Sequence, residues 1–173
     1  MNAGDRNAWA GDQDTRPLSD LGERQSAAQA DALAAAPVDA LYSGRALRCR
    51  QTLRPLAERL GLEVRVLEEL GEFQAWKAPE AWDPDANRGA NAAAHAAGSA
   101  MRAIERIRER HAGGRVVACS HGNVIPALAA YLIAAHGLRN VAELKRRGQW
   151  FRLRLEGAHV QIELREVEGF PTE

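Results

Sequence analysis

The sequence predicts a three-layer α/β/α sandwich built around a mostly parallel sheet. Short apolar or alternating runs at 38–43, 63–67 and 115–119 are typical of strands. Between these runs, apolar residues recur at separations of three and four, which is typical of helices with one buried face. Strands that alternate with helices favour a parallel sheet covered on both faces.

Length and charge limit the function classes. The chain has 173 residues, 23 basic and 23 acidic, so its formal net charge is zero and nothing indicates a nucleic-acid or membrane partner. The polar start contains no signal peptide, and no apolar run is long enough to cross a bilayer. Cys49 and Cys119 match no metal-binding spacing. We therefore expect a cytoplasmic protein with reduced thiols, forming a single domain over 1–173.

The first elements are a loop and a capped helix. Residues 1–16 are rich in Gly, Asp and Asn and predict a loop, although an α/β domain usually opens on a strand. Ser19 is the expected N-cap of a helix that ends before Pro37. Three residues are expected to share the apolar face of this helix: Leu21, Ala28 and Leu33.

A second helix is expected over 46–60, where Gly61 is the stop signal and Pro55 should bend or split the helix. Residues 71–98 hold Trp76 and Trp82 and an Ala/Asn-rich tract with no clear period. They predict an irregular excursion over the carboxyl edge of the sheet, with room for a short helix.

The second half of the chain returns to regular patterns. Residues 101–110 predict a helix, and 115–119 a buried strand. The alternating runs 150–155 and 160–164 flank Gly157 and predict a hairpin at a sheet edge.

Ser120, His121 and Gly122 lie where the strand 115–119 turns into an apolar-striped helix. In open α/β sheets ligands bind at this place, because a helix N-terminus offers N–H groups and positive potential to an anion. Gly122 would let the backbone approach the ligand closely. The alternative is a Ser120 that caps the helix beside a solvated His121.

Arg48, Glu72 and His121 each follow a predicted strand, so they could share one pocket at the carboxyl edge of the sheet. An arginine in the first turn of a helix is unfavourable next to the positive helix end, unless an anion lies between them. Arg45 and Arg50 are rival candidates, and all three arginines could instead be a solvated face. Glu72 by itself is equally consistent with an ordinary surface glutamate.

Together, these pieces carry a resemblance to a known family. The segments are Arg16-Pro17-Leu18-Ser19, Leu41-Tyr42-Ser43, Arg48-Cys49-Arg50-Gln51-Thr52, Leu70-Gly71-Glu72 and Cys119-Ser120-His121-Gly122. In order and spacing they resemble the histidine phosphatase superfamily, which has the phosphoglycerate mutase-like fold. This short chain, with Gly4-Asp5-Arg6 and Trp9 near its start, is most similar to the phosphohistidine phosphatase (SixA-like) branch of that family.

The resemblance implies phosphoryl transfer through a phosphohistidine. Arg48 would hold the phosphoryl oxygens, His121 would hydrogen-bond them, and Glu72 would be the general acid and base. The implied substrate-binding set is Arg16, Arg48, Ser120, His121 and Gly122. No metal or other cofactor is implied, since arginines and helix N-termini supply the positive charge that phosphoryl transfer needs. The implied partner is a phosphorylated small molecule or a phosphohistidine protein.

One family feature is missing. The first strand, with the Arg-His motif that carries the nucleophile, would lie immediately before Asn2, and none of His95, His111, His136 and His159 follows a strand as Arg-His. We expect an N-terminally truncated domain that is inactive as written, with a natural remnant as the alternative explanation. Three functions stay open: hydrolysis of phosphohistidine or a small phosphomonoester, the same chemistry on nucleotide phosphates, and non-catalytic phosphate binding.

Overall fold

Three parallel strands form the sheet at the centre of the molecule. The structure, a computed structural model, describes residues 1–72 and 88–171. The strands are β1 (Ala40–Ser43), β2 (Val64–Val66) and β3 (Val116–Cys119), in the order β2-β1-β3. β1 is paired in parallel with both neighbours, and Leu41 lies opposite Val64 on one side and Val117 on the other. All three strands fall within the ranges that the sequence predicts.

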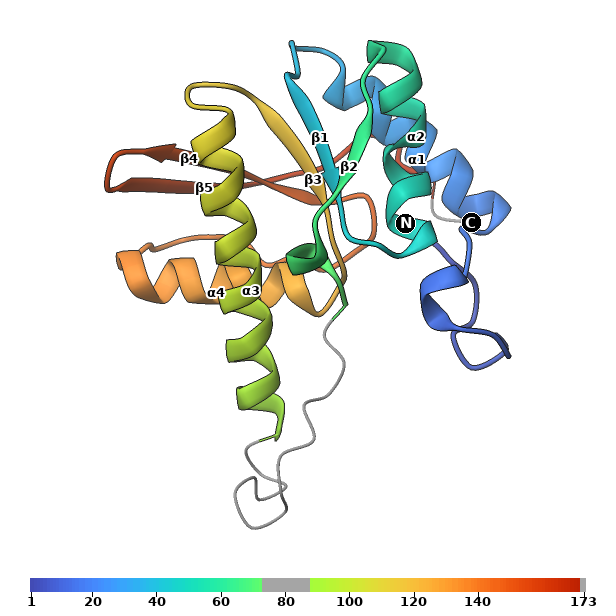
Figure 1. Cartoon of the computed structure of the whole chain (residues 1–173), viewed down its shortest axis with the longest axis horizontal. Coiled ribbons are helices and arrows are strands. Elements are labelled where there is room, and N and C mark those ends of the chain that lie inside the picture. The colour runs from blue at the N-terminus through green and yellow to red at the C-terminus, as the bar shows by residue number, and fades with distance from the viewer. Residues whose placement is uncertain (73–87, 172–173) are drawn as a thin grey trace.

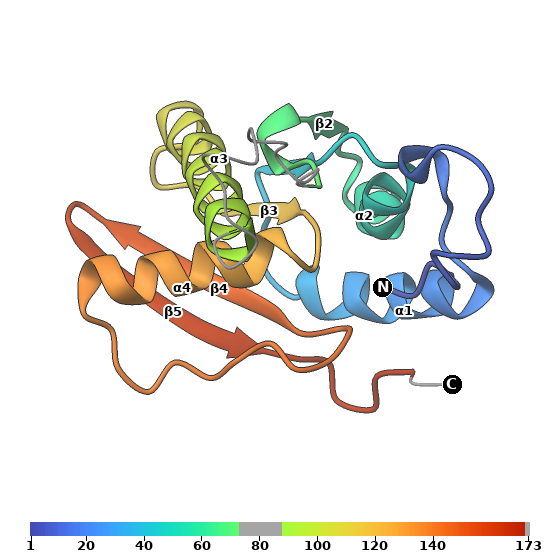
Figure 2. The ribbon, with the colours of Figure 1, turned by 90° about the horizontal axis from the view of Figure 1, so that it is seen from below.

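Helices cover both faces of this sheet, so the three-layer α/β/α prediction is confirmed. α1 (Asp20–Leu33) and α2 (Leu47–Leu60) lie on one face, and α3 (Arg88–Arg110) lies on the other (Figure 1). α4 (Val124–His136) packs against α3, which the view from below shows clearly (Figure 2). Within the described part of the chain, no helix combines the length and apolarity needed to cross a bilayer.

The two-residue period of β1 divides the core between the faces of the sheet. Leu41 is fully buried and packs with Leu53 and Leu56 on the α1 and α2 side. The side chains that alternate with it, Ala40 and Tyr42, belong to the cluster on the α3 side. All four residues of β1 are buried because it is the central strand and has a covered face on each side.

α1 begins as the sequence predicts, but its buried face is different. Ser19 is the N-cap, and its hydroxyl accepts a hydrogen bond from the Gly22 amide at 3.2 Å. Leu21 and Ala28 are only half-buried. The buried face is centred on a set that is partly polar: Gly22, Gln25, Ser26, Gln29, Ala30 and Leu33. Hydrogen bonds explain the shift, because a satisfied polar side chain can be buried: Gln25 accepts from the Asn2 amide and donates to the Pro171 carbonyl, and Ser26 donates to the Glu23 carbonyl.

α2 and α3 are both more continuous than expected. α2 runs through Pro55 without a break, so the helix is not split, and it ends at Gly61 in the left-handed conformation. α3 begins at Arg88 rather than 101. Alanine has the highest helix propensity, so the Ala-rich tract that was expected to be irregular continues the helix. The rest of the expected excursion, at 73–87, lies outside the described residues.

The C-terminal hairpin forms a separate two-stranded sheet. β4 (Trp150–Glu156) and β5 (His159–Arg165) pair antiparallel, as the alternating pattern predicts. They are not hydrogen-bonded to the parallel sheet, so the expected position at its edge is wrong. The hairpin runs along α4 (Figure 2). Trp150 packs against the core on the α1 and α2 side.

β3 is less buried than the sequence predicts. Ala118 is exposed and the other three residues of the strand are half-buried. The physical reason is that, among the described strands, only β1 is hydrogen-bonded to β3, so one edge of β3 has no strand partner among them. Two short 3-10 helices complete the described structure, Gln13–Thr15 (η1) and Glu68–Leu70 (η2).

Candidate active site

Arg48, Glu72 and His121 are in direct contact at the carboxyl end of the parallel sheet, and we call them the Arg–Glu–His cluster. One terminal nitrogen of Arg48, Nη2, lies 2.6 Å from Glu72 Oε2 and 3.1 Å from His121 Nδ1. The same histidine nitrogen is 3.9 Å from Glu72 Oε2. The three side chains come from parts of the chain up to 73 residues apart.

The topology of the fold brings these side chains together. Arg48 is the second residue of α2, directly after β1 and its turn. Glu72 follows η2, the short helix after β2, and His121 follows β3 just before α4. Because the strands are parallel, the segments that leave them meet at one edge of the sheet, at the lower ends of the strands in Figure 1.

His121 is buried and neutral. Its residue is 6% exposed, and burial, followed by the positive charge of Arg48, lowers the pKa of His121 to about 4. A guanidinium can only donate hydrogen bonds, so Nδ1 of His121 accepts from Arg48 and the ring proton is on Nε2. That Nε2 faces the Cys49 sulfur at 3.6 Å.

Arg48 is held in place by a second contact on the opposite side. Its Nη1 donates to the carbonyl oxygen of Gln13, which lies in η1. The loop 1–16 thereby forms one wall of the site. Glu72 also binds this loop, since its Oε1 lies 3.1 Å from Nη1 of Arg6, which is 61% exposed.

Arg16 lies close to the cluster without joining it. Its Nη1 donates to the carbonyl oxygens of Ala3 and Gly4 at 2.8 and 3.1 Å, and its buried Nε has no partner among the described residues. Burial, and then the charges of Arg48 and Arg6, lower the pKa of Arg16. Several guanidinium groups thus raise the positive potential at one place, which favours an anion.

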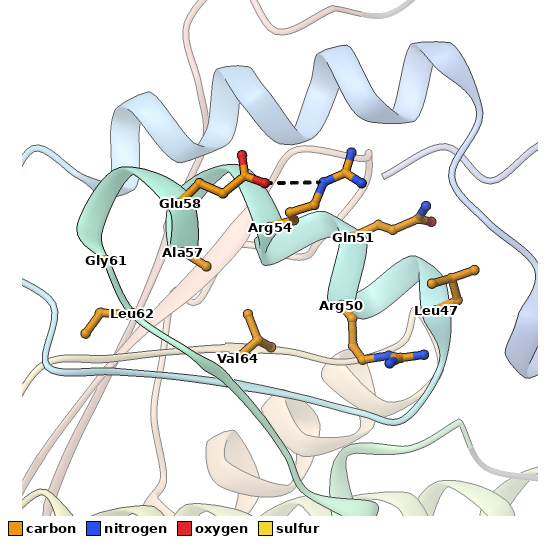
Figure 3. Close-up of a pocket in the computed structure, with 9 residues that line it drawn as sticks. All are labelled: Leu47, Arg50, Gln51, Arg54, Ala57, Glu58, Gly61, Leu62 and Val64. Carbon is orange, nitrogen blue, oxygen red and sulfur yellow. Dashed lines mark ion pairs between the residues drawn. The ribbon is translucent and has the colours of Figure 1, made fainter.

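The rival arginines lie elsewhere. Arg45 is ion-paired with Asp14 at 2.6 Å and is more than half exposed. Arg50 points into a groove of about 420 Å³ between α2 and β2, which Figure 3 shows with the neighbouring pair Arg54 and Glu58. None of the residues that line this groove belongs to the Arg–Glu–His cluster.

Ser120 and Gly122 flank His121 but differ in their surroundings. The Ser120 hydroxyl donates to the Leu70 carbonyl at 2.8 Å, and the N-cap of α4 is Asn123. The alternative of a capping Ser120 beside a solvated histidine is therefore wrong. Gly122 is exposed, and a Cβ atom there would meet nothing within 4 Å.

The other four histidines belong to other segments of the chain. His95 is in α3, His136 ends α4 and His159 begins β5. His111 follows α3, and its Nε2 is 3.0 Å from the hydroxyl of Tyr42.

Sequence reasoning missed Gln13 and Cys49 as parts of the site. Gln13 contributes a backbone carbonyl, for which a side-chain pattern gives no signal. Cys49 is next to Arg48 in the first turn of the same helix, and this adjacency was the available clue that Cys49 lies at the site. Within residues 1–72 and 88–171, no group of three or more His, Cys, Asp or Glu side chains is arranged to hold a metal ion.

Comparison with known proteins gives a match along almost the whole chain. The description "histidine phosphatase superfamily (branch 1)" belongs to the family model that matches residues 2–166. Among solved structures, the protein histidine phosphatase SixA complexed with tungstate is 18% identical, with a TM-score of 0.64 over 96% of this chain and 94% of that one.

Two further structures share the fold. The Entamoeba histolytica phosphoserine phosphatase mutant with phosphoserine is 19% identical, with a TM-score of 0.61 over 84% of this chain and 82% of that one. A mycobacterial glucosyl-3-phosphoglycerate phosphatase with VO3 is 24% identical, with a TM-score of 0.56 over 89% and 87% of the two chains.

Proposed function

The chain belongs to the histidine phosphatase superfamily, and on that premise we propose that it binds the phosphoryl group of a phosphohistidine protein or a small phosphomonoester at the Arg–Glu–His cluster. The observation that carries the proposal is the mutual contact of Arg48, Glu72 and His121 at a sheet edge. Neighbours in fold that hold tungstate, VO3 or phosphoserine support an anion of phosphate shape there.

The proposed binding mode uses Arg48 as the main contact. Its guanidinium can pair with two phosphoryl oxygens at once, in place of its present contact with Glu72. The N-cap of α2 is Ala46, which has no side-chain acceptor for the first-turn N–H groups. Those groups therefore add positive potential on the side from which Arg48 approaches the anion.

His121 and Glu72 would complete the chemistry. His121 is neutral while the site is empty, and an anion beside it would favour its protonated form, which donates from both nitrogens. Glu72 lies beside Arg48 and is partly exposed, so it can exchange protons with water. We assign Glu72 the role of general acid toward the leaving oxygen and general base toward water.

On this proposal the 173-residue chain binds phosphate and hydrolyses phosphomonoesters slowly at most. Covalent catalysis divides one difficult displacement into two easier ones, and it needs a nucleophile in line with the phosphorus. His121 is occupied by Arg48 and Cys49, and the other four histidines belong to other segments and do not follow a strand as Arg-His. Direct attack by water, helped by Arg48 and Glu72, accounts for the residual rate.

A fusion experiment tests this proposal. Burial lowers the pKa of the Met1 amino group, and Asn2 is held by hydrogen bonds to Gln25 and Ser19, so a segment joined to Met1 starts from an ordered part of the fold. We would fuse a short strand-forming segment ending in Arg-His to Met1 and measure p-nitrophenyl phosphate turnover. The matched control is the same segment ending in Arg-Ala.

We expect the Arg-His fusion to raise the rate by several orders of magnitude, the scale of loss when an enzyme's nucleophile is removed. An acid-labile, base-stable phosphoenzyme should form in that fusion and not in the Arg-Ala control. Equal rates for the two fusions, or rapid turnover with a phosphoenzyme in the unfused chain, would contradict the assignment. A panel of phosphohistidine, phosphoserine and nucleotide substrates would then rank the substrate classes.

A further inference from the structure

The two cysteines of the chain lie side by side at the edge of the Arg–Glu–His cluster. Cys49 is in the first turn of α2, and Cys119 is the last residue of β3. Both sulfurs point at one backbone oxygen, the carbonyl of Ser120, at 3.7 Å from Cys49 and 3.9 Å from Cys119. Neither cysteine is in a disulfide, and contact with the same carbonyl oxygen brings the two sulfurs close to each other.

This pair is also in contact with the proposed phosphoryl site. Cys49 Sγ lies 3.6 Å from Nε2 of His121, and Cys49 follows Arg48 directly on the same helical turn. A change in the position of this sulfur therefore also affects Arg48 and His121, the two groups that would contact the anion. A pair of inert core thiols would have no such connection to polar groups.

The two thiols differ in a way that suits sequential oxidation. The pKa of Cys119 is lowered, first by its interaction with the neighbouring Cys49 thiol, and the nearby Arg48 charge acts in the same direction. The interaction with Cys119, together with burial, raises the pKa of Cys49. As a residue, Cys119 is half-buried whereas Cys49 is 4% exposed, and a lowered pKa favours the reactive thiolate, so we assign Cys119 the first reaction with the oxidant.

We propose that Cys49 and Cys119 are a reversible thiol–disulfide pair that a peroxide oxidises and that controls anion binding at the neighbouring cluster. The Cys119 thiolate attacks the peroxide, the O–O bond breaks, and a sulfenic acid and hydroxide form. Cys49 then attacks that sulfur, an S–S bond forms and water leaves. In total, two thiols and one hydrogen peroxide give one disulfide and two waters.

The consequence for anion binding rests on the proposed function. A disulfide brings the sulfurs to about 2.0 Å from each other, so Cys49 Sγ moves away from His121 and the first turn of α2 is pulled toward β3. Arg48 is on that turn. We expect the disulfide form to bind inorganic phosphate on the order of tenfold more weakly, a usual size for coupling between two sites.

The test begins with the chemistry, without any substrate. The full chain is treated with hydrogen peroxide, and its intact mass should fall by two hydrogen atoms and recover with dithiothreitol. Trypsin cleaves at arginine, so the disulfide should link peptide 49–50 to peptide 116–139. C49S and C119S are the matched controls, and neither should show this loss or this linked peptide. Two unreacted thiols, disulfide-linked dimers or sulfinic acid in the native chain would overturn the proposal.

Phosphate titration of reduced and oxidised protein then tests the coupling, and C49S treated with peroxide controls for other oxidation. Equal phosphate affinity of the reduced and the oxidised protein would overturn the proposal that the disulfide controls anion binding. A reversible disulfide in a chain that binds no phosphate in either state would support the thiol pair and count against the proposed function instead. The two failures are therefore distinguishable.

Discussion

Protonation of His121 should destabilise the fold by an amount that the site geometry sets. The ordinary pKa of the residue is 6.5, and in the folded chain burial and Arg48 lower it to about 4. The unfolded chain therefore binds a proton between these values while the folded chain does not. The difference of roughly 2.5 pKa units corresponds to about 3 kcal/mol. The part of the free energy of unfolding that depends on the neutral ring is fully present above pH 6.5 and is lost as the pH falls toward 4.

Urea unfolding followed by circular dichroism measures this effect. We expect the free energy of unfolding of the native chain to fall between about pH 7 and about pH 4 more steeply than that of His121→Gln, by about 3 kcal/mol in total. His136→Gln is the matched control, because His136 is exposed at the end of α4. Parallel pH profiles for the native chain and His121→Gln would refute the burial of a neutral imidazole.

Three further results are expected. Inorganic phosphate should raise the pKa of His121 in an NMR titration, because an anion favours the charged ring; an unchanged pKa in a phosphate-bound chain would separate His121 from the anion. Arg48→Lys should weaken phosphate binding at least about tenfold by calorimetry, since the two-pronged contact is lost, and equal affinity would exclude Arg48 as the main contact. Gly22→Ala should destabilise the fold by about 1–3 kcal/mol. A Cβ there would lie 1.9 Å from the Asn2 carbonyl oxygen, whereas one at Gly98 meets nothing, so Gly98→Ala should stabilise α3 by up to about 1 kcal/mol in the same thermal melts.

The sheet could be predicted because its strands are short and strongly patterned. The run at β1 and the run at β3 both end where polar residues begin, so their position and direction followed from the sequence. The burial of β3 could not be predicted in the same way. Burial depends on which strand lies alongside, and a local pattern does not contain that information.

The site was partly predictable for the same reason. Parallel topology places everything that follows a strand at one edge, which is why Arg48, Glu72 and His121 were expected together. The choice among the arginines needed the helical phase of α2. Arg48 points to the sheet edge and Arg50 into the groove on the other side. A helix that started one residue earlier or later would present a different arginine to the sheet edge.

The role of Ser120 was not predictable, because its partner is a distant backbone group. The hydroxyl donates to the carbonyl of Leu70, 50 residues earlier in the chain. A serine before a helix is a common cap, so local rules favoured that alternative. Contacts between a side chain and a remote main-chain atom leave no spacing for sequence reasoning to detect.

The central claim is that the Arg–Glu–His cluster is an anion site, and a crystal of the chain soaked in tungstate tests it most directly. Tungstate has the shape of phosphate, and its tungsten gives a strong anomalous signal that locates it without bias. We expect one peak at the carboxyl edge of the sheet, with oxygens about 3 Å from the Arg48 guanidinium and the His121 ring. Tungstate bound only elsewhere, with Arg48 still paired to Glu72 at 2.6 Å, would contradict the account.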